Sequence, residues 1–406
     1  MSEWKCYKLN EISSLSNGIN FDKSAYTSGV KLIGVSDFKN RIHPDYDSLQ
    51  EVDSKVVKSG DYLEKGDIVF VRSNGNKELV GRCMIIDRDI PVTYSGFCIK
   101  LHLKDKKRFD PVFFNYLFKT RQFKKSMTGT AVGANIQNLS QSRLGSCEVN
   151  VPDIETQKRI ATILSRYDSL IENYQKQIKL LEEAAQRRYK EWFVDLRFPG
   201  HENTKIVDGV PEGWELKSVT NNHLFDVAKC RIALFNGNKT YYATADVEGT
   251  YFCNSGVKIE YDNKPSRAQI QPSLYSVWFA RMSNSFKIVG FVEQNNNRRE
   301  DSILSSGFAG FESHYERFGF LYCLISSQWF NDQKDRYATG ATQVSITNEG
   351  LSRIRCLLPT TRLAEEFSLV TNKIIEETIL YRENCTMLTE ARDRLLPKLM
   401  NGEIAV

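Results

Sequence analysis

Hydrophobic residues recur every seven positions in two long stretches of the chain. The first stretch carries two such series, offset by four positions: Ile160, Tyr167, Tyr174 and Leu181, and Leu164, Ile171, Ile178, Ala185 and Trp192. The second stretch carries Phe367, Ile374, Tyr381, Leu388 and Leu395. Two series of apolar residues at seven-residue spacing, offset by four positions, lie on one face of a helix, and such a face packs against another helix. The pattern predicts two long heptad helices, over 153–197 and 360–406.

The two stretches belong to an internal repeat. A shift of 207 positions brings both copies into register without a gap and pairs Gly133 with Gly340, Leu139 with Ile346, Ser140 with Thr347, Leu144 with Leu351, and Pro152 with Pro359. Ser140 and Thr347 are suited to cap the short helical turn that follows each. Further upstream the run 67–82 resembles the run 276–291, which aligns Arg72 with Arg281. A gap-free match continued by shared heptads makes two unrelated domains a poor explanation.

The repeat divides the chain into five segments. Residues 198–213 are rich in Gly and Pro and therefore form the predicted linker between the two copies. The expected fold is α/β (α+β), with two similar globular domains that are separated and joined by two long antiparallel helices in a pseudo-two-fold arrangement. The predicted segments are a first globular domain (1–152), a first helix (153–197), the linker (198–213), a second globular domain (214–359) and a second helix (360–406).

Composition restricts the class of protein without identifying it. Hydrophobic residues make up 41% of the 406 residues, which is enough for packed cores. We see neither a membrane-length apolar run nor a signal peptide, and we expect the nine scattered cysteines to be reduced in a cytoplasmic protein. The formal charge of +5 permits a nucleic-acid partner, but phosphate binding would require local clusters of basic residues.

The sequence lacks the common catalytic motifs. We find no methyltransferase N-P-P-Y tetrapeptide, dinucleotide-binding glycine loop, P-loop, zinc-protease motif or nucleophile elbow, so we expect no catalytic residue, metal or cofactor in this chain. One alternative is a magnesium-dependent nuclease, because Asp45, Asp53 and Lys55 imitate a P-D…D-x-K motif. Such a triple arises easily by chance in a charged chain. A second alternative is a coiled-coil adaptor with no DNA role.

The order of the motifs resembles the specificity subunits of type I restriction–modification systems across the whole chain. The resemblance is carried by Trp4 and Trp214, by the segments 129–144 and 339–351, and by "VPDIETQKRI" (151–160) and "LTEARDRLLPKLMNGEI" (388–404). The duplication of weak motifs in this order is specific. One departure is "PTTRLAEEF" (359–367), since the family's P-x-x-E-Q glutamine is present in the first copy, as Gln157, but absent from the second.

The resemblance implies a non-catalytic subunit that reads a bipartite DNA target. Each globular half would be a target recognition domain for one half-site, and the helices would hold the two domains at a fixed distance. The first helix would span about 60 Å at ~1.5 Å per residue, compared with ~34 Å for one turn of DNA. Two methyltransferase subunits would dock on this chain and restriction/translocase subunits would join. S-adenosylmethionine, ATP and Mg would belong to those partners.

Candidate DNA contacts are side chains that can read base edges or grip phosphates. The loops 72–77 and 281–287 each follow an apolar strand-like run and precede another, which predicts hairpin loops that project from a sheet. The candidates are Arg72, Asn74, Lys77, Thr93, Tyr94, Arg281, Asn284, Lys287, Arg298 and Arg299. We also expect Trp192, Phe193 and Leu196 to extend an exposed apolar stripe for a methyltransferase subunit.

Overall fold

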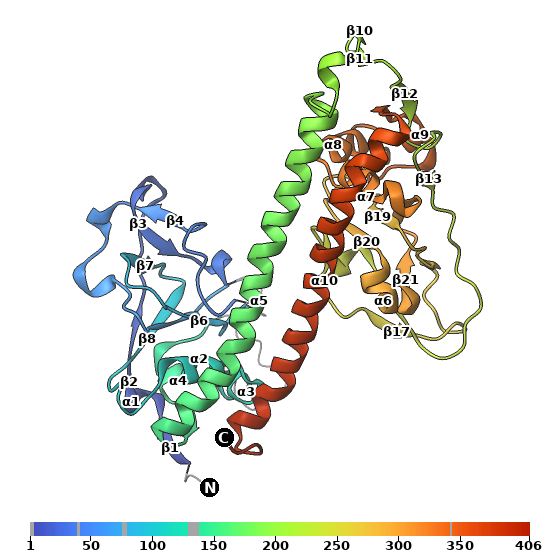
Figure 1. Ribbon diagram of the computed structural model, residues 1–406. Coiled ribbons are helices and arrows are strands. Elements are labelled where there is room, and N and C mark those ends of the chain that lie inside the picture. Colours follow the sequence, from blue (N-terminus) through green and yellow to red (C-terminus); the bar gives the residue numbers. More distant parts are fainter. Residues whose placement is uncertain (1–3, 39–40, 75–78, 129–137, 342) are drawn as a thin grey trace. The chain divides into compact units, whose positions relative to one another are not determined.

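The chain forms two compact units, each containing the globular domain of one copy of the repeat (Figure 1). A computed structural model describes residues 4–38, 41–74, 79–128, 138–341 and 343–406. Unit 1 comprises Met1–Ile171 together with Met387–Val406, and unit 2 comprises Glu172–Thr386. Both long helices therefore contribute residues to both units.

The described residues of unit 1 form three small sheets and four short α-helices besides the long ones. Its four-stranded sheet has the order β2 (Ser13–Asn17), β8 (Cys98–Leu103), β5 (Ile68–Val71) and β6 (Cys83–Ile85). The others are β4 (Gln50–Val52), β3 (Tyr26–Ile33) and β7 (Val92–Tyr94), and the pair β1 (Lys5–Lys8) with β9 (Glu148–Val151). The helices are α1 (Leu9–Ile12), α2 (Pro111–Lys119), α3 (Arg121–Thr128) and α4 (Gln141–Gly145).

Unit 2 has the same plan with additional strands. One four-stranded sheet has the order β13 (Asp226–Val227), β22 (Phe308–Glu312), β19 (Ser276–Ala280) and β20 (Ile288–Phe291). The second has the order β17 (Val257–Ile259), β14 (Lys239–Tyr242), β21 (Ser302–Ser305) and β18 (Ala268–Ile270). Two-stranded pairs are β12 (Glu215–Ser218) with β23 (Arg355–Leu358), and β15 (Val247–Glu248) with β16 (Tyr251–Phe252). The helices are α6 (Asn296–Asp301), α7 (Tyr315–Ile325), α8 (Gln328–Arg336) and α9 (Asn348–Arg353).

The topology confirms the internal repeat. The sheet order β2-β8-β5-β6 corresponds strand for strand to β13-β22-β19-β20. In the second sheet of each unit, a parallel pair recurs, β3 with β7 in unit 1 and β14 with β21 in unit 2. The predicted caps are also present, because the hydroxyl of Ser140 accepts from Arg143 N and that of Thr347 accepts from Gly350 N. The linker contains a hairpin, β10 (Ile206–Val207) and β11 (Val210–Pro211), that turns at Asp208-Gly209.

Local sequence explains the central elements of each unit. The strand β5 reads Ile-Val-Phe-Val and is buried at all four positions, as is every residue of β19. Both therefore lie in the middle of a sheet that is covered on both faces. Helix α2 begins with Pro111 in its first turn, where a missing N–H is harmless, and the side chain of Asp110 caps it by accepting from Phe113 N at 2.8 Å.

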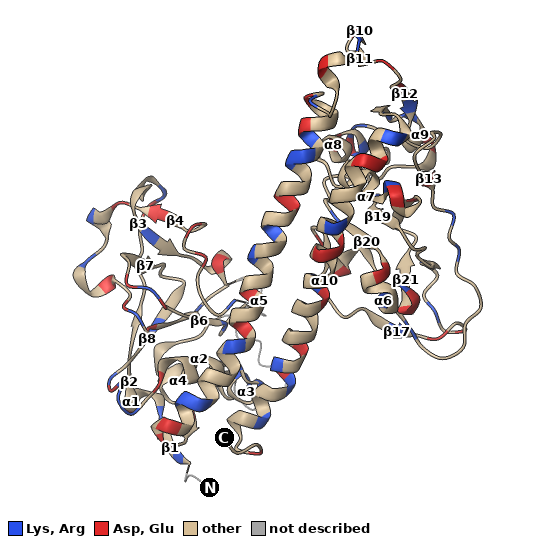
Figure 2. Cartoon of the chain, viewed as in Figure 1, with Lys and Arg blue, Asp and Glu red and all other residues tan. Residues whose placement is uncertain are grey.

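The two heptad stretches form α5 (Ile154–Tyr189), continued by a short π-helix (Lys190–Val194), and α10 (Thr361–Met400). Within unit 2 they pack side by side and antiparallel: the tilted rings of Tyr174 and Tyr381 have centroids 4.8 Å apart, and those of Trp192 and Phe367 are 5.5 Å apart. Within unit 1, Asp168 on α5 pairs with Arg392 on α10. Charges of both signs are distributed along both helices (Figure 2).

The ends of the helices are part of the globular cores. Trp192 and Phe193 are 8% exposed and pack in the unit 2 core, and Leu196 is packed against it. The expectation that they form an exposed stripe is therefore wrong. The reason is that the chain turns back after the helix, so that Trp214 lies against Phe193 at 5.9 Å and covers it. In unit 1 the end of α10 is used similarly, since Leu399 and Met400 are core residues.

The missing glutamine of the second copy is replaced from another element. In unit 1 the buried amide of Gln157 donates to Pro152 O and Arg108 O and accepts from Asp110 N. In unit 2 the equivalent position is Ala364, and the carbonyl of Pro359 lies 3.2 Å from His223 Nε2 instead. The start of each long helix is thus tied to its globular domain by a polar side chain, but by a different one in each copy.

We expect Gln157→Ala to destabilise unit 1 by about 1–3 kcal/mol, because it leaves buried backbone donors and acceptors without partners. Denaturant unfolding followed by tryptophan fluorescence measures the change. Gln177→Ala is the matched control, since Gln177 lies on the same helix and its amide donates to the neighbouring Asn173. An equal loss of stability in both variants would show that the clamp around Gln157 has no special role.

Candidate nucleic-acid interface

The two predicted loops occupy equivalent places in the two units. The loop after β5 begins at Arg72, and the loop after β19 begins at Arg281; each leads to the neighbouring strand of the same sheet. Lys77 and its neighbours in the first loop lie outside the described residues. The second loop, 281–287, is described in full and shows how this element is built.

Each loop is joined by backbone hydrogen bonds to the residues just before a short helix of its own unit, α4 in unit 1 and α9 in unit 2. In unit 1, Leu139 N donates to Arg72 O at 2.7 Å, and Ser73 bridges to Asn138. In unit 2, Ile346 N donates to Arg281 O at 2.9 Å. Leu139 and Ile346 are partners in the repeat. The same two-loop arrangement is therefore present in both units, formed by segments distant in sequence.

Arg281 holds this arrangement together in unit 2. Its guanidinium donates to Phe308 O, Ile346 O and the side chain of Asn348, at 3.2, 3.1 and 2.8 Å. Burial lowers the pKa of the group. Arg72 has a smaller role of the same kind, since its Nη1 donates to Gly96 O at 3.3 Å. The geometry indicates that these arginines position the loops from within.

A buried lysine inside the domain holds the backbone of the second loop by hydrogen bonds. Lys334, on α8, is 1% exposed and its Nζ donates to Met282 O at 3.0 Å and to Ser285 O at 2.6 Å. Burial lowers its pKa, and the adjacent carboxylate of Asp335 opposes that shift. Asp335 also accepts from Asn284 N. Sequence reasoning missed both residues, because a lysine in the polar helix "QWFNDQKDR" carries no signal that it is buried.

The supported loop exposes a mixed set of side chains. Asn284 has a left-handed backbone, with φ of +52°, and its side chain is exposed, as are those of Met282 and Phe286. The neighbouring segment is tied to the loop because Ser283 N donates to Val344 O at 3.0 Å. That segment exposes Gln343 and Val344. Two amides and several apolar side chains thus share one surface of unit 2. We call this surface, formed by the loop 281–287 together with Gln343 and Val344, the 281–345 rim.

Other predicted candidates have internal partners. Thr93 is buried and donates to Asp61 O, and the hydroxyl of the buried Tyr94 lies 2.7 Å from Ser16 Oγ. Burial raises the pKa of Tyr94 to about 12, and the hydrogen bond with Ser16 opposes that shift. Lys287 Nζ donates to Thr244 O at 2.7 Å. Any DNA contact by these three groups would compete with a contact inside the domain. Asn74 is partly buried at the end of the described part of its loop.

Arg298 and Arg299 are also engaged. Arg298 forms a bidentate ion pair with Glu383 on α10, at 2.6 and 2.8 Å, and donates to Tyr242 Oη at 2.9 Å. Arg299 donates to Asn296 Oδ1 at 2.8 Å and to Pro272 O at 3.4 Å. The basic pair that the sequence offered for phosphate is therefore occupied by contacts within unit 2.

The nuclease alternative finds no support in the geometry. Asp45 pairs with Arg41 at 2.8 Å, and Asp53 caps its own turn by accepting from Lys55 N at 2.9 Å. Among the described residues, no group of His, Cys, Asp or Glu side chains is arranged to bind a metal ion. Within the same residues, we find no helix with the length and apolar character needed to cross a membrane.

Comparison with known proteins finds similarity to type I restriction–modification specificity subunits. The family described as "Type I restriction modification DNA specificity domain" matches residues 1–183. The MjaIX specificity subunit of Methanocaldococcus jannaschii is 28% identical over 72% of this chain and 68% of its own. The HindI specificity subunit of Haemophilus influenzae is 23% identical over all of both chains.

A solved structure shares the fold. The type I restriction–modification S subunit from M. genitalium superimposes with a TM-score of 0.61 over 98% of this chain and 96% of its own, at 16% identity. Residues 1–183, which contain the first globular domain, thus match this DNA specificity domain, and the chain is similar over its length to type I restriction–modification specificity subunits.

Proposed function

We propose that this chain reads a bipartite DNA target, one half-site with each recognition domain, and directs adenine methylation and restriction by partner subunits. The observation that carries the proposal is the two-loop arrangement that recurs in both units. In each, the loop after the central strand is joined to the residues before α4 or α9 by a backbone hydrogen bond, Leu139 N to Arg72 O or Ile346 N to Arg281 O. A duplicated binding element suits a target made of two half-sites.

The 281–345 rim has the chemistry for reading bases. Asparagine and glutamine amides form paired hydrogen bonds with adenine, and apolar side chains contact the methyl group of thymine. Asn284 and Gln343 provide the amides, and Met282, Phe286 and Val344 provide exposed apolar groups. Because Lys334 and Arg281 fix the backbone from inside, little ordering would be needed on binding. The second domain is thus proposed to read a half-site that contains A·T pairs.

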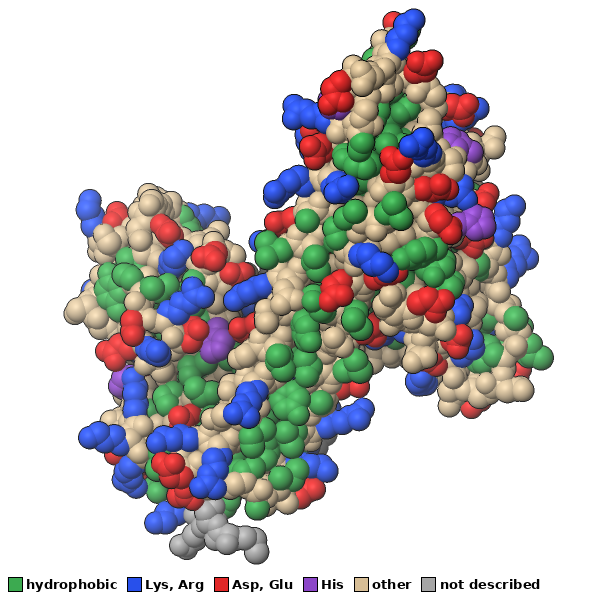
Figure 3. Space-filling view, in the orientation of Figure 1, with side chains coloured by type: hydrophobic (Ala, Val, Ile, Leu, Met, Phe, Trp, Pro, Cys, Tyr) green, Lys and Arg blue, Asp and Glu red, His purple; other side chains and the backbone are tan. Residues whose placement is uncertain are grey.

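The long helices are proposed to carry the partner subunits. Figure 3 shows hydrophobic side chains along α10, and two of its apolar residues are well exposed, Leu369 (74%) and Met387 (59%). Exposed apolar side chains of this kind are typical of protein interfaces. Two methyltransferase subunits would dock there, with restriction/translocase subunits joining them. S-adenosylmethionine, ATP and Mg would be bound by those partners.

The adaptor alternative makes a different prediction about nucleic acid. A coiled-coil adaptor would not shift a DNA duplex, whereas a specificity subunit in complex with its methyltransferase should bind DNA with a strong dependence on salt. Methylation profiling of a host that expresses the complex tests the proposed function directly. The proposal expects one split motif with two defined half-sites, and a host genome without such a motif would refute it.

We expect Asn284→Ala to relax the second half-site at one position and to leave the first half-site unchanged. A lost base-specific contact costs about 1–3 kcal/mol, which would appear as methylation of sites with a changed base at that position. The control is Asn263→Ala, because Asn263 is an exposed asparagine of the same unit that lies outside the rim. Asn74→Ala should act on the first half-site instead. Equal weakening at every site would show that Asn284 grips phosphate.

We expect the paired helices to set the spacer between the half-sites. Asp168 pairs with Arg392, and Glu182 pairs with Arg382, so a deletion in one helix alone moves these two contacts out of register. Removing residues 171–177 together with 384–390 shortens both helices by one heptad and keeps both pairs. At ~1.5 Å per residue the loss is about 10 Å, or about three base pairs at ~3.4 Å each.

Methylation profiling measures the spacer of each deletion variant. The matched deletion should retain both half-sites with a shorter spacer, while deletion of 171–177 alone should abolish methylation. A matched deletion that methylates with the original spacer would mean that the docked methyltransferase subunits set the distance.

A further inference from the structure

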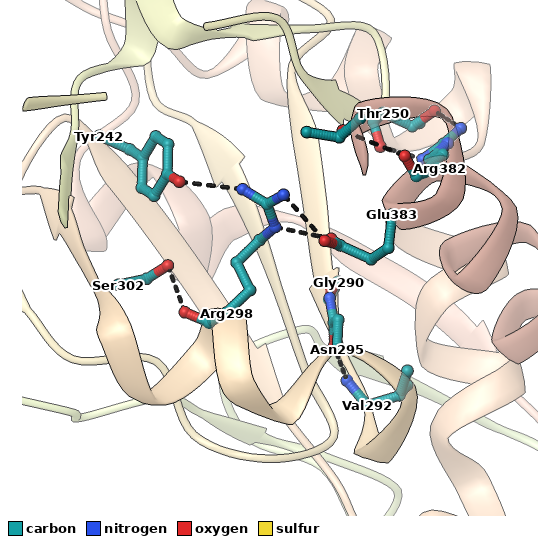
Figure 4. A network of polar contacts seen from close by, with 10 residues as sticks. Tyr242, Thr250, Gly290, Val292, Asn295, Arg298, Ser302, Arg382 and Glu383 are labelled. Atoms are coloured by element: carbon teal, nitrogen blue, oxygen red, sulfur yellow. Dashed lines mark hydrogen bonds and ion pairs between the residues drawn. The ribbon is translucent and has the colours of Figure 1, made fainter. Parts of the chain in front are cut away.

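Two adjacent residues of α10 connect three elements of unit 2 (Figure 4). Glu383 pairs with Arg298, which lies on α6 of the globular domain. Arg382 pairs with Glu182 on α5 and donates to both the carbonyl and the hydroxyl oxygen of Thr250, in the turn between β15 and β16. We call these contacts the α10 junction. At this one turn, α10 holds its partner helix and the recognition domain together.

The Arg298 side of the junction is directional and largely shielded from water. The side chains of Arg298 and Glu383 are 17% and 22% exposed. Both guanidinium contacts to the carboxylate are short, Tyr242 accepts a third hydrogen bond, and the guanidinium lies 5.3 Å from the ring centre of Phe252. A bidentate arginine–carboxylate pair fixes orientation as well as distance. Although burial lowers the pKa of Arg298, Glu383 and Tyr242 together outweigh it and the net shift is upward.

Arg298 itself is held rigidly by its own domain. The buried amide of Asn295 donates to Gly290 O at 3.0 Å and accepts from Val292 N at 2.8 Å, which fixes the turn before α6 to the end of β20. At the other end of α6, the hydroxyl of Ser302 donates to Arg298 O at 2.7 Å. A displacement of Glu383 would therefore be transmitted to the sheet, because the backbone at Arg298 is held at both ends of α6.

The first copy has a different arrangement. Positions 175 and 176, which align with Arg382 and Glu383, are Gln and Lys. Unit 1 instead joins Asp168 to Arg392 and to the hydroxyl of Tyr116 on α2. The repeat therefore does not explain the α10 junction, which is specific to the second domain.

We propose that Arg298 and Glu383 are positioning residues that hold the second recognition domain at one place on the paired helices and thereby restrict the complex to a single spacer length. The inference rests on the proposed function. A partly buried ion pair adds little net stability compared with an apolar replacement, so stability alone explains the pair poorly. Its effect is geometric, since it removes freedom of the domain along the helix.

The test is the spectrum of spacer lengths methylated in a host that expresses the whole complex. The variants are Glu383→Gln, which keeps the side-chain shape, Arg298→Met, which keeps much of its length, and the exchanged pair Arg298→Glu with Glu383→Arg. We expect both single variants to keep the two half-sites, to add spacers one base pair longer or shorter, and to methylate the original spacer about tenfold less, the change that accompanies ~1.4 kcal/mol. The exchanged pair should restore a single spacer.

The controls separate this inference from the proposed function and from loss of folding. Glu366→Gln removes an ion pair that lies within α10, between Arg362 and Glu366, and should leave the spectrum unchanged. If the Arg298→Met protein does not accumulate in the host, the spacer spectrum of the milder variant Glu383→Gln is the deciding result. A single unchanged spacer in Glu383→Gln, or loss of methylation at every spacer, overturns the inference. Absence of any split motif with the unaltered chain refutes the proposed function instead.

Discussion

Antiparallel packing of α5 against α10 underlies the rest of the structure, because the core of each unit contains side chains from both helices. The unit 1 core takes Ile160 and Leu164 from α5 and Leu396 and Leu399 from α10. The unit 2 core takes Tyr189 from α5, Trp192 and Phe193 from the π-helix that continues it, and Leu363, Phe367 and Ile375 from α10. Neither globular domain is closed by its own copy of the repeat alone. Separation of the helices would expose apolar surface in both units, which links the integrity of one domain to that of the other.

The heptad pattern and the internal repeat together predicted most of the fold. It predicted both helices, and the 207-residue shift predicted that one sheet topology would occur twice, as it does. The spacing could not show where each helix end would pack. Trp192 and Phe193 look like a continuation of the seam, and their burial depends on Trp214, which returns to them after the linker hairpin. That contact joins segments about 20 residues apart. It depends on the direction in which the chain turns after the helix, which hydrophobic periodicity cannot predict.

The candidate site was less accessible to sequence reasoning. The positions of both loops were predictable, since each follows an apolar strand. The roles of the charged side chains were not, because a polar residue in a polar segment gives no sign of burial. Lys334 lies in such a segment and is nearly inaccessible, and Arg298 is paired with a residue 85 positions away. Such contacts depend on tertiary packing that composition and local pattern do not encode.

The arginines that recur in both copies take part in building the loops. If the two domains read different half-sites, as proposed, they would share the residues that build the loop and differ in those that contact bases. Arg72 and Arg281 recur, and both donate to carbonyl oxygens of their own domains. The supports themselves have diverged, since Lys334 aligns with the buried Met127, and His223 replaces the contact of Gln157. Residues that preserve a backbone position can be exchanged for others that do the same. The side chains that specify the target are therefore expected at exposed positions such as 282, 284 and 286 of the second loop.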